Sequence, residues 1–220
     1  MTVSNTLRPL ALALLIVLAC VLRYGPASAA KLETLIVAGG CFWCVEADFE
    51  QVPGVVGAVS GFTGGTEENP TYKQVSAHKT GHYEAVQITF DPDIVSRETL
   101  LAMFFRSVDP TDAGGQFCDR GNTYRTAIFV SDKGEMAMAT QVKAQAQSDL
   151  GKTIVTRILA ETRFYPAETG HQDYYKGTDL VLTRFGPKRQ NKAYKLYRQA
   201  CGRDARVREL WGAAAPFAGG

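Results

Sequence analysis

A chain of 220 residues, of which 45% are apolar, is long enough to bury one substantial hydrophobic core. Its net charge of +2 is small and its basic residues are scattered, which argues against a nucleic-acid surface and against a membrane protein held by electrostatic attraction. The default expectation is one globular domain, a monomer, whose partners are not selected by charge.

The first thirty residues differ in character from the rest of the chain. Arg8 precedes an apolar run over 10–22, and the small residues at 27–29 match the pattern cut by signal peptidase. The run is shorter than the roughly 18 to 20 residues that a membrane-spanning helix needs. We therefore expect a signal peptide over 1–29, a single domain over 30–220, and no membrane span in the mature protein.

A second processing route is open at Val17-Leu18-Ala19-Cys20, which would leave Cys20 lipidated at a new N-terminus. Leu18 fits the lipoprotein pattern poorly. Either route carries the domain to the periplasm or another exported location, where disulfides persist. The cysteines of the mature chain must therefore be considered both as thiols and as disulfide partners.

From Leu32 onward the chain shows no long linker, repeat or low-complexity tract. Hydrophobic periodicity and turn residues predict, in chain order, a strand at 33–38, a helix at 41–52, strands at 55–62 and 83–90, a helix at 96–105, a loop at 109–122, a strand at 123–130, a helix at 133–150 and a strand at 154–160. Strands alternating with helices predict an α/β sandwich. The Gly- and Ala-rich end after Trp211 is expected to fray.

Cys41 and Cys44 form a C-x-x-C motif directly after Gly39 and Gly40, where the first strand turns into the first helix. A thiolate in the first turn of a helix faces unpaired N–H groups and the positive end of the helix dipole, which lowers its pKa. The glycines allow a sharp turn and a close approach of another molecule. These features make Cys41 a candidate nucleophile.

Two other interpretations of this motif are open, and a third is disfavoured. A structural disulfide is a serious alternative in an exported protein. A thioredoxin-like thiol–disulfide oxidoreductase is the main alternative function, although two aromatic residues between the cysteines are unusual for that class. A metal site is not expected, because a zinc ion needs four ligands and no metal-ligand spacing is formed by Cys118, Cys201, His78, His82 and His171.

The string Gly40-Cys41-Phe42-Trp43 closely resembles the signature of the A-type peptide methionine sulfoxide reductases. Further segments look like that family's in the family's order, at 52–55, 61–65, 69–72, 81–86 and 119–125. The resemblance covers most of the mature chain. It implies a two-layer sandwich of a mixed sheet with packed helices and a ferredoxin-like core, no metal or organic cofactor, and repair activity on the S epimer of methionine sulfoxide, free or in oxidised proteins.

The same resemblance implies a role for each site residue. Cys41 is the nucleophile, Phe42 and Trp43 cradle the substrate methyl group, and Glu84 is the acid. The part of the site that faces the sulfoxide oxygen is lined by Tyr72, Asp119 and Tyr124. The roles agree with the chemistry, because the oxygen of a sulfoxide leaves only when it gains a proton, and burial on a strand would raise the pKa of a glutamate.

Without that context each of these residues has a plain structural alternative. A glutamate on a strand is usually solvated, and a tyrosine is usually half-buried packing with a satisfied hydroxyl. Asp119 suits a loop in which it bonds its own backbone. His171 we assign to structure, since an isolated histidine beside aromatic residues more often satisfies a buried hydrogen bond.

After oxygen transfer Cys41 becomes a sulfenic acid, and a second thiol must condense with it. Cys201 resembles the C-terminal resolving cysteine of many family members and is favoured here, although the residues that follow it are not the glycine-rich tail that mobility requires. Cys44, one turn along the same helix, and Cys118, in the loop beside Asp119, are the alternatives. An external reductant of thioredoxin type must then open the disulfide.

Overall fold

The computed structural model describes residues 31–219 of the chain. The predicted signal peptide over 1–29 and the lipidation site at Cys20 lie outside the described residues. Within residues 31–219 no helix is both long enough and apolar enough to cross a membrane.

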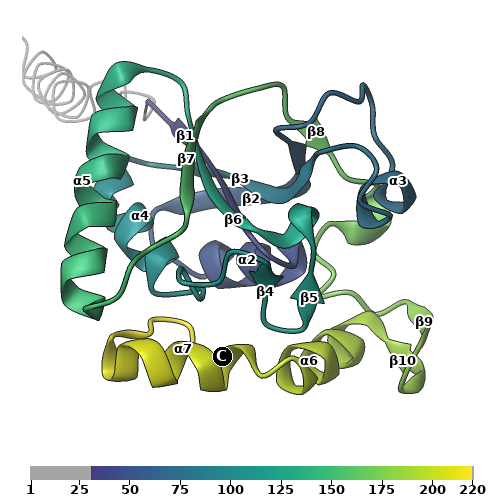
Figure 1. The fold of residues 1–220 in the computed structure, drawn as a ribbon. Helices are drawn as coiled ribbons and strands as arrows, with labels where there is room; N and C mark the ends of the chain where they lie inside the picture. The colour runs from purple at the N-terminus through teal and green to yellow at the C-terminus, as the bar shows by residue number, and fades with distance from the viewer. Residues whose placement is uncertain (1–30, 220) are drawn as a thin grey trace, which may run out of the picture. The chain divides into compact units, whose positions relative to one another are not determined.

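A six-stranded mixed sheet lies at the centre, with its strands in the order β7-β6-β1-β3-β2-β8 (Figure 1). The strands are β1 (Glu33–Gly39), β2 (Val55–Thr63), β3 (Tyr83–Phe90), β6 (Thr126–Val130), β7 (Arg157–Ala160) and β8 (Tyr165–Pro166). All neighbouring pairs in this sheet are antiparallel except β6 and β7, which run parallel. Strands β1, β2, β3 and β6, with a helix after β1 and another after β3, form the split β-α-β arrangement of the expected ferredoxin-like core.

The remaining elements complete the unit that begins at Leu32. The helices are α2 (Phe42–Glu50), α3 (Tyr72–Ser76), α4 (Arg97–Phe105), α5 (Lys133–Leu150), α6 (Gln190–Ala200) and α7 (Arg203–Trp211), with 3-10 turns at η1 (Asn122–Tyr124), η2 (Thr169–His171) and η3 (Gly212–Ala214). Two small ribbons pair β4 (Gly115–Gln116) with β5 (Asp119–Arg120) and β9 (Leu180–Thr183) with β10 (Gly186–Arg189).

The two faces of the sheet carry separate apolar clusters because side chains alternate along each strand. On one face Leu35, Val37 and Ile88 pack with Phe49 of α2 and Phe104 of α4 in the larger cluster. The opposite face holds a smaller cluster of Ile36, Ala38, Tyr83, Ala85, Ala127 and Phe129. Helices cover the face with the larger core, which confirms the expected two-layer sandwich.

Local capping explains why the predicted helices have the observed bounds. The side chain of Ser96 accepts a hydrogen bond from the Thr99 amide at 3.1 Å at the start of α4. Asp132 accepts one from the Glu135 amide at 2.9 Å at the start of α5, and Gly151 ends that helix with a φ of 64°. These signals act within a few residues, so the sequence alone could locate them.

Four expectations from the sequence need correction. The strand predicted at 123–130 begins at Thr126, because η1 occupies the preceding residues, and the strand predicted at 154–160 begins at Arg157. The loop predicted at 109–122 contains the β4–β5 ribbon. The chain after Trp211 does not fray over its described part, because the Phe217 side chain is buried and its ring lies 5.5 Å from the ring of Phe49.

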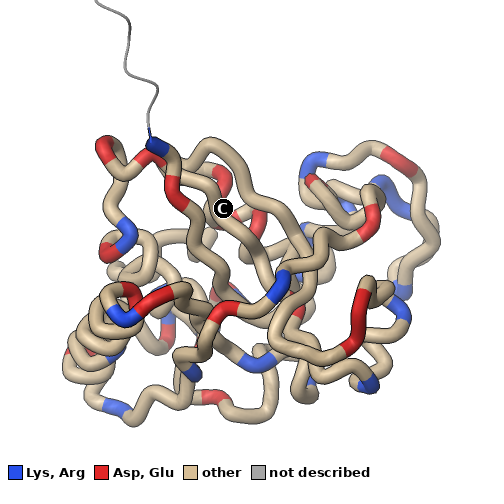
Figure 2. The backbone as a smooth tube through the Cα atoms, turned by 90° about the horizontal axis from the view of Figure 1, so that it is seen from above, with Lys and Arg blue, Asp and Glu red and all other residues tan. Residues whose placement is uncertain are grey.

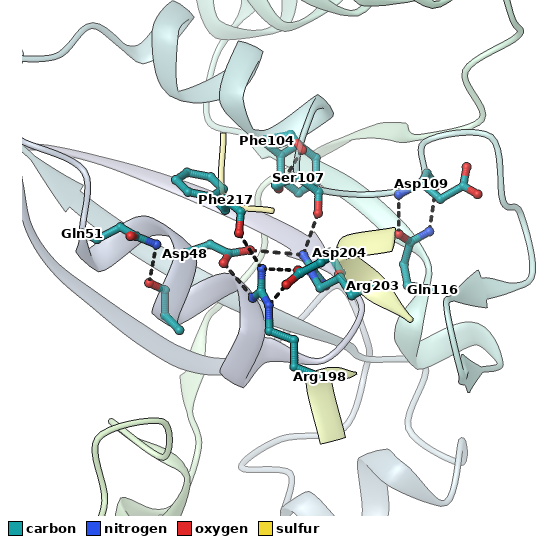
Figure 3. A network of polar contacts seen from close by, with 12 residues as sticks. Asp48, Gln51, Phe104, Ser107, Asp109, Gln116, Arg198, Arg203, Asp204 and Phe217 are labelled. Atoms are coloured by element: carbon teal, nitrogen blue, oxygen red, sulfur yellow. Dashed lines mark hydrogen bonds and ion pairs between the residues drawn. The ribbon is translucent and has the colours of Figure 1, made fainter. Parts of the chain in front are cut away.

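A buried ionic network fastens the C-terminal helices to α2, as Figure 3 shows. The Arg198 guanidinium donates to Asp48 at 2.7 Å and to Asp204 at 2.9 Å. Arg203 lies 3.6 Å from the second oxygen of Asp48 and donates to the carbonyl of Gly39 at 3.2 Å. Helices α6 and α7, which run below the sheet in Figure 1, are thereby tied to the turn that precedes Cys41.

Replacing Asp48 with asparagine should lower the free energy of unfolding by about 3 kcal/mol or more, because it removes a buried counter-charge from Arg203 and leaves Arg198 paired with Asp204 alone. Denaturant unfolding of the purified variant measures the change. The matched control is Asp149→Asn, which removes a pair with Arg106 near the surface and should cost less than about 1 kcal/mol. An equal decrease in the free energy of unfolding for both variants would contradict the conclusion that the Asp48 network stabilises the packing of α6 and α7 against α2.

Candidate active site

A cavity of about 230 Å³ opens between the β1–α2 turn, β3, the β4–β5 ribbon and the C-terminal helices. The structure brings every catalytic, substrate-binding and resolving candidate from the sequence into this one cavity. It is lined by Cys41, Phe42, Trp43, Tyr72, Glu84, Asp119 and Tyr124 together with Cys44, Cys118 and Cys201. These residues come from six separate segments of the chain. Only the fold therefore makes them one site.

Cys41 caps α2 directly after the turn that ends β1. Its side chain is half-buried, and its carbonyl accepts a hydrogen bond from the Cys44 amide at 3.1 Å. Gly40 makes the turn with a φ of +81°, and a Cβ there would lie 2.6 Å from the Cβ of Gln116. Both the backbone conformation and the lack of space therefore require glycine at this position.

The predicted low pKa of Cys41 does not follow from its position on the helix. The hydrogen bond with Cys44, burial, and the nearby carboxyls of Glu84 and Asp119 raise the pKa of Cys41 well above its usual value. The same hydrogen bond lowers the pKa of Cys44, with help from the positive charge of Arg203. Of the two thiols, Cys44 is therefore the more acidic.

The first N–H group of α2 forms its hydrogen bond with the carboxyl group of Glu84 and not with the Cys41 sulfur. The Phe42 amide, the first N–H of α2, donates to Oε2 of Glu84 at 3.1 Å. Glu84 lies on β3 with 2% of its surface exposed, and burial raises its pKa to about 8 despite the hydrogen bonds from Phe42 and from the Tyr124 side chain. At neutral pH it is a carboxylic acid that carries a proton beside Cys41.

Two tyrosines and an aspartate surround that acid. Tyr72 opens α3, and its amide donates to Glu168 at 3.0 Å. Burial raises the pKa of the Tyr72 and Tyr124 hydroxyls, which keeps both groups as hydrogen-bond donors. Burial also raises the pKa of Asp119, against the charge of Arg203. The cavity thus presents the hydroxyl groups of Tyr72 and Tyr124 and the protonated carboxyl of Glu84 as hydrogen-bond donors.

Aromatic rings form the apolar side of the cavity. The Trp43 ring stacks on Tyr174, with centroids 3.8 Å apart and planes 5° apart, and on His171 at 5.7 Å. His171 also stacks on Tyr72 at 4.2 Å, and burial lowers its pKa. Phe42 is almost fully buried and lies beside Tyr72 with centroids 6.1 Å apart. Of these rings, those of Phe42, Trp43 and Tyr72 line the cavity and give it an apolar side.

The cysteines at the site are in two redox states. Cys41 and Cys44 are free thiols, whereas Cys118 and Cys201 form a disulfide with Cα atoms 4.8 Å apart. Cys201 ends α6 and is followed at once by Gly202 and α7. It is therefore held between two helices and does not lie on the mobile tail considered from the sequence.

Several residues that line the cavity were missed by the sequence reasoning: Phe117, Arg184, Tyr194, Tyr197, Arg198 and Arg203. Arg198 and Arg203, which lie on either side of Cys201, were visible in the sequence. Arginines near a chain end are usually solvated, so the sequence does not mark these two as site residues. Arg203 is only 2% exposed. Its burial depends on contacts with segments about a hundred or more residues away, so no local signal reveals it.

Comparisons with known proteins place the chain among related sequences and structures. Residues 33–212 match the family described as peptide methionine sulfoxide reductase. A protein of Rhizobium meliloti (strain 1021) named peptide methionine sulfoxide reductase MsrA 2 is 44% identical over 187 residues, covering 85% of this chain and 87% of that protein. The MsrA of Bacillus subtilis (strain 168) is 46% identical over 186 residues, covering 83% and 98%.

Two solved structures are similar in fold. Reduced Mxr1 from Saccharomyces cerevisiae superposes with a TM-score of 0.64 at 29% identity, covering 68% of this chain and 87% of that one. Methionine sulfoxide reductase A of Corynebacterium diphtheriae superposes with a TM-score of 0.60 at 29% identity, covering 68% and 76%.

Proposed function

Since the chain belongs to the peptide methionine sulfoxide reductase family, we propose that Cys41 is the nucleophile and Glu84 the acid of its reaction. The protein is an oxidoreductase that uses thiols to reduce methionine sulfoxide to methionine, an activity that repairs oxidised proteins. Its substrate is the S epimer, free or within a polypeptide, bound with its methyl group against Phe42 and Trp43.

The observation that carries this assignment is a free thiol next to a protonated carboxylic acid in one cavity. Attack of the Cys41 sulfur on the sulfoxide sulfur sends electrons to the oxygen, and Glu84 supplies the proton that this oxygen needs. Tyr72 and Tyr124 donate hydrogen bonds to the same oxygen. The sulfur–oxygen bond of the substrate breaks, methionine is released, and the oxygen remains on Cys41 as a sulfenic acid.

The proton of the Cys41 thiol also needs a destination when the sulfur attacks. As the Cys41 sulfur bonds to the sulfoxide sulfur its proton becomes strongly acidic, and the Cys44 sulfur, which shares a hydrogen bond with Cys41, accepts it. In the next step the Cys44 sulfur attacks the sulfenic acid and water leaves, which forms a Cys41–Cys44 disulfide. We propose Cys44 as the resolving residue in place of Cys201, because Cys44 is a free thiol in contact with Cys41 while Cys201 is already bonded to Cys118.

Activity should decline as the pH rises through about 8, because Glu84 has a raised pKa of about 8 and holds its proton only below that value. The measurement is kcat/KM for a methionine sulfoxide peptide between pH 6 and pH 10. In Glu84→Gln, whose side chain does not titrate, the residual activity should lack this decline. A wild-type profile that keeps rising to pH 10 would contradict the assignment of Glu84 as the acid.

The direct test of the function uses a peptide with a single methionine sulfoxide, resolved into its two epimers, with dithiothreitol as reductant. The wild type should convert the S epimer and leave the R epimer unchanged. If the folded wild type converts neither, the C-x-x-C motif would instead indicate a thiol–disulfide oxidoreductase, the alternative function, which would show in the reduction of a protein disulfide.

The cellular setting is part of the proposal. We propose that the segment over 1–29 exports the protein to the periplasm or another location outside the cytoplasm, where it acts as a monomer and receives electrons from a thioredoxin-like protein. The apolar run and small residues of that segment support export. The mass of the protein recovered from a periplasmic fraction tests it: cleavage near Ala29 supports the proposal, and an intact Met1 in the cytoplasm contradicts it.

A further inference from the structure

Arginines line the cavity at positions 184, 198 and 203, and two of them already have carboxylate partners. Arg198 forms ion pairs with Asp48 and Asp204. Arg203 lies 3.6 Å from Asp48 and has only 2% of its surface exposed. Arg184 is exposed, and within residues 31–219 it forms no ion pair with a carboxylate. Its positive charge is therefore open to a bound anion.

The surroundings of Arg184 hold its side chain at the cavity. The residue lies in the turn between β9 and β10, and its guanidinium carbon is 4.9 Å from the ring centroid of Phe185 and 5.0 Å from that of Tyr197. These two rings contact each other edge to face, with centroids 5.3 Å apart. Stacking on aromatic rings restrains a guanidinium group and leaves the N–H groups in its plane free to donate hydrogen bonds.

Arg184 belongs to the part of the cavity that also holds Asp119. Burial raises the pKa of Asp119, and the positive charge of Arg184 opposes that rise. The Asp119 carboxyl in turn helps to raise the pKa of Cys41. Charges act on one another in this way only over short distances, because solvent and salt screen them. Cys41, Asp119 and Arg184 thus belong to one continuous part of the cavity.

A methionine sulfoxide bound in the proposed way has its sulfur atom at Cys41, and its main-chain atoms follow after two methylene groups. In the free amino acid, and at the C-terminus of a chain, the main chain ends in a carboxylate. Inside a polypeptide it continues as an uncharged amide. A guanidinium binds a carboxylate through two parallel charge-assisted hydrogen bonds, which are roughly twice as strong as a bond to a neutral carbonyl.

We propose that Arg184 binds the α-carboxylate of methionine sulfoxide, so that the protein prefers the free amino acid or a C-terminal residue to the same residue inside a polypeptide. The inference rests on the proposed function, because it requires the substrate sulfur to lie at Cys41. An internal residue still reacts, since its carbonyl oxygen also accepts a hydrogen bond from the guanidinium. The preference is about tenfold in kcat/KM, because Arg184 is exposed and water competes for it.

The experiment compares two substrates that differ only in the charge of this one group: N-acetylmethionine (S)-sulfoxide, which has a carboxylate, and its uncharged amide. With dithiothreitol as reductant, the wild type should favour the acid by about tenfold in kcat/KM. Arg184→Gln should lose about this factor with the acid, mainly through KM, and stay within about twofold of the wild type with the amide. Arg184→Lys keeps the charge without the bidentate geometry, so its loss should be smaller.

Lys195→Gln is the matched control, because Lys195 is an exposed cation on α6 that does not line the cavity. This variant should keep the wild-type preference for the acid. Equal losses with acid and amide in Arg184→Gln would show that Arg184 only supports the packing of the β9–β10 turn, and would overturn the inference. A wild type that converts both substrates without preference would also overturn it. A wild type that converts neither would count against the proposed function itself.

Ionic strength supplies an independent measurement. Raising the salt concentration from about 0.05 M to about 0.5 M should lower the wild-type kcat/KM for the acid several-fold and leave that for the amide nearly unchanged, because salt screens an exposed ion pair. Arg184→Gln should show no such difference between the two substrates. A salt effect of the same size in Arg184→Gln would overturn the inference, because the effect would then come from another charge.

Discussion

Replacing Cys41 with serine is expected to remove methionine sulfoxide reduction, lowering kcat/KM by about 10⁴-fold or more, as the loss of a nucleophile does in other covalent enzymes. A serine hydroxyl at this position is a far weaker nucleophile than a thiol, and it cannot take up the oxygen as a sulfenic acid. Methionine released from the S-epimer peptide with dithiothreitol, separated by chromatography, measures the loss.

The matched control for this substitution is Cys44→Ser on the same helix. This variant keeps the nucleophile, so a single turnover should still release about one methionine per protein and leave Cys41 as a sulfenic acid that a dimedone-type reagent traps. A Cys41→Ser variant that keeps more than a few per cent of wild-type turnover would contradict the assigned nucleophile. A Cys44→Ser variant that releases no methionine would show that Cys44 is also needed for the first step.

Replacing Glu84 with glutamine should lower kcat/KM by about 10²-fold or more, the usual effect of a lost general acid. The amide has nearly the same shape, and its oxygen still accepts the hydrogen bond from the Phe42 amide, so the geometry of the turn is kept. What it lacks is the proton that the buried carboxyl holds at neutral pH. The effect should fall on kcat more than on KM.

Glu161→Gln is the control for this change, because Glu161 is an exposed glutamate outside the cavity. It should reduce the S-epimer peptide at the wild-type rate. The rate at which an alkylating reagent modifies Cys41 should be similar in all three proteins, which shows that the site is intact. Loss of activity within about twofold for Glu84→Gln would contradict the assignment of Glu84 as the acid.

The pKa of Cys41 is an instructive case in which a sound local argument failed. A cysteine at a helix N-terminus gains from the helix dipole, and the sequence places Cys41 there correctly. The fold, however, directs the first N–H of α2 to Glu84 and surrounds the thiol with Cys44 and buried carboxyls. Electrostatic effects depend on every neighbour within a few ångströms, and most of those neighbours are distant in sequence.

The sequence by itself determined features that arise from contacts between nearby residues. Apolar periodicity located the strands and helices, the Asp132 cap and Gly151 set the ends of α5, and the glycine turn placed Cys41 at a helix start. The motif around Cys41 and the segments that resemble the reductase family also named the residues that the fold gathers into the cavity.

Only the tertiary structure decided which distant groups meet. It joined Cys118 to Cys201 across 83 residues, left Cys44 as the thiol in contact with Cys41, and buried Arg203 at the edge of the cavity. Pairing between cysteines cannot be deduced from their spacing, because several connectivities are compatible with one sequence. Burial of a charge likewise depends on whether remote partners compensate for its desolvation, and those partners are known only once the chain has folded.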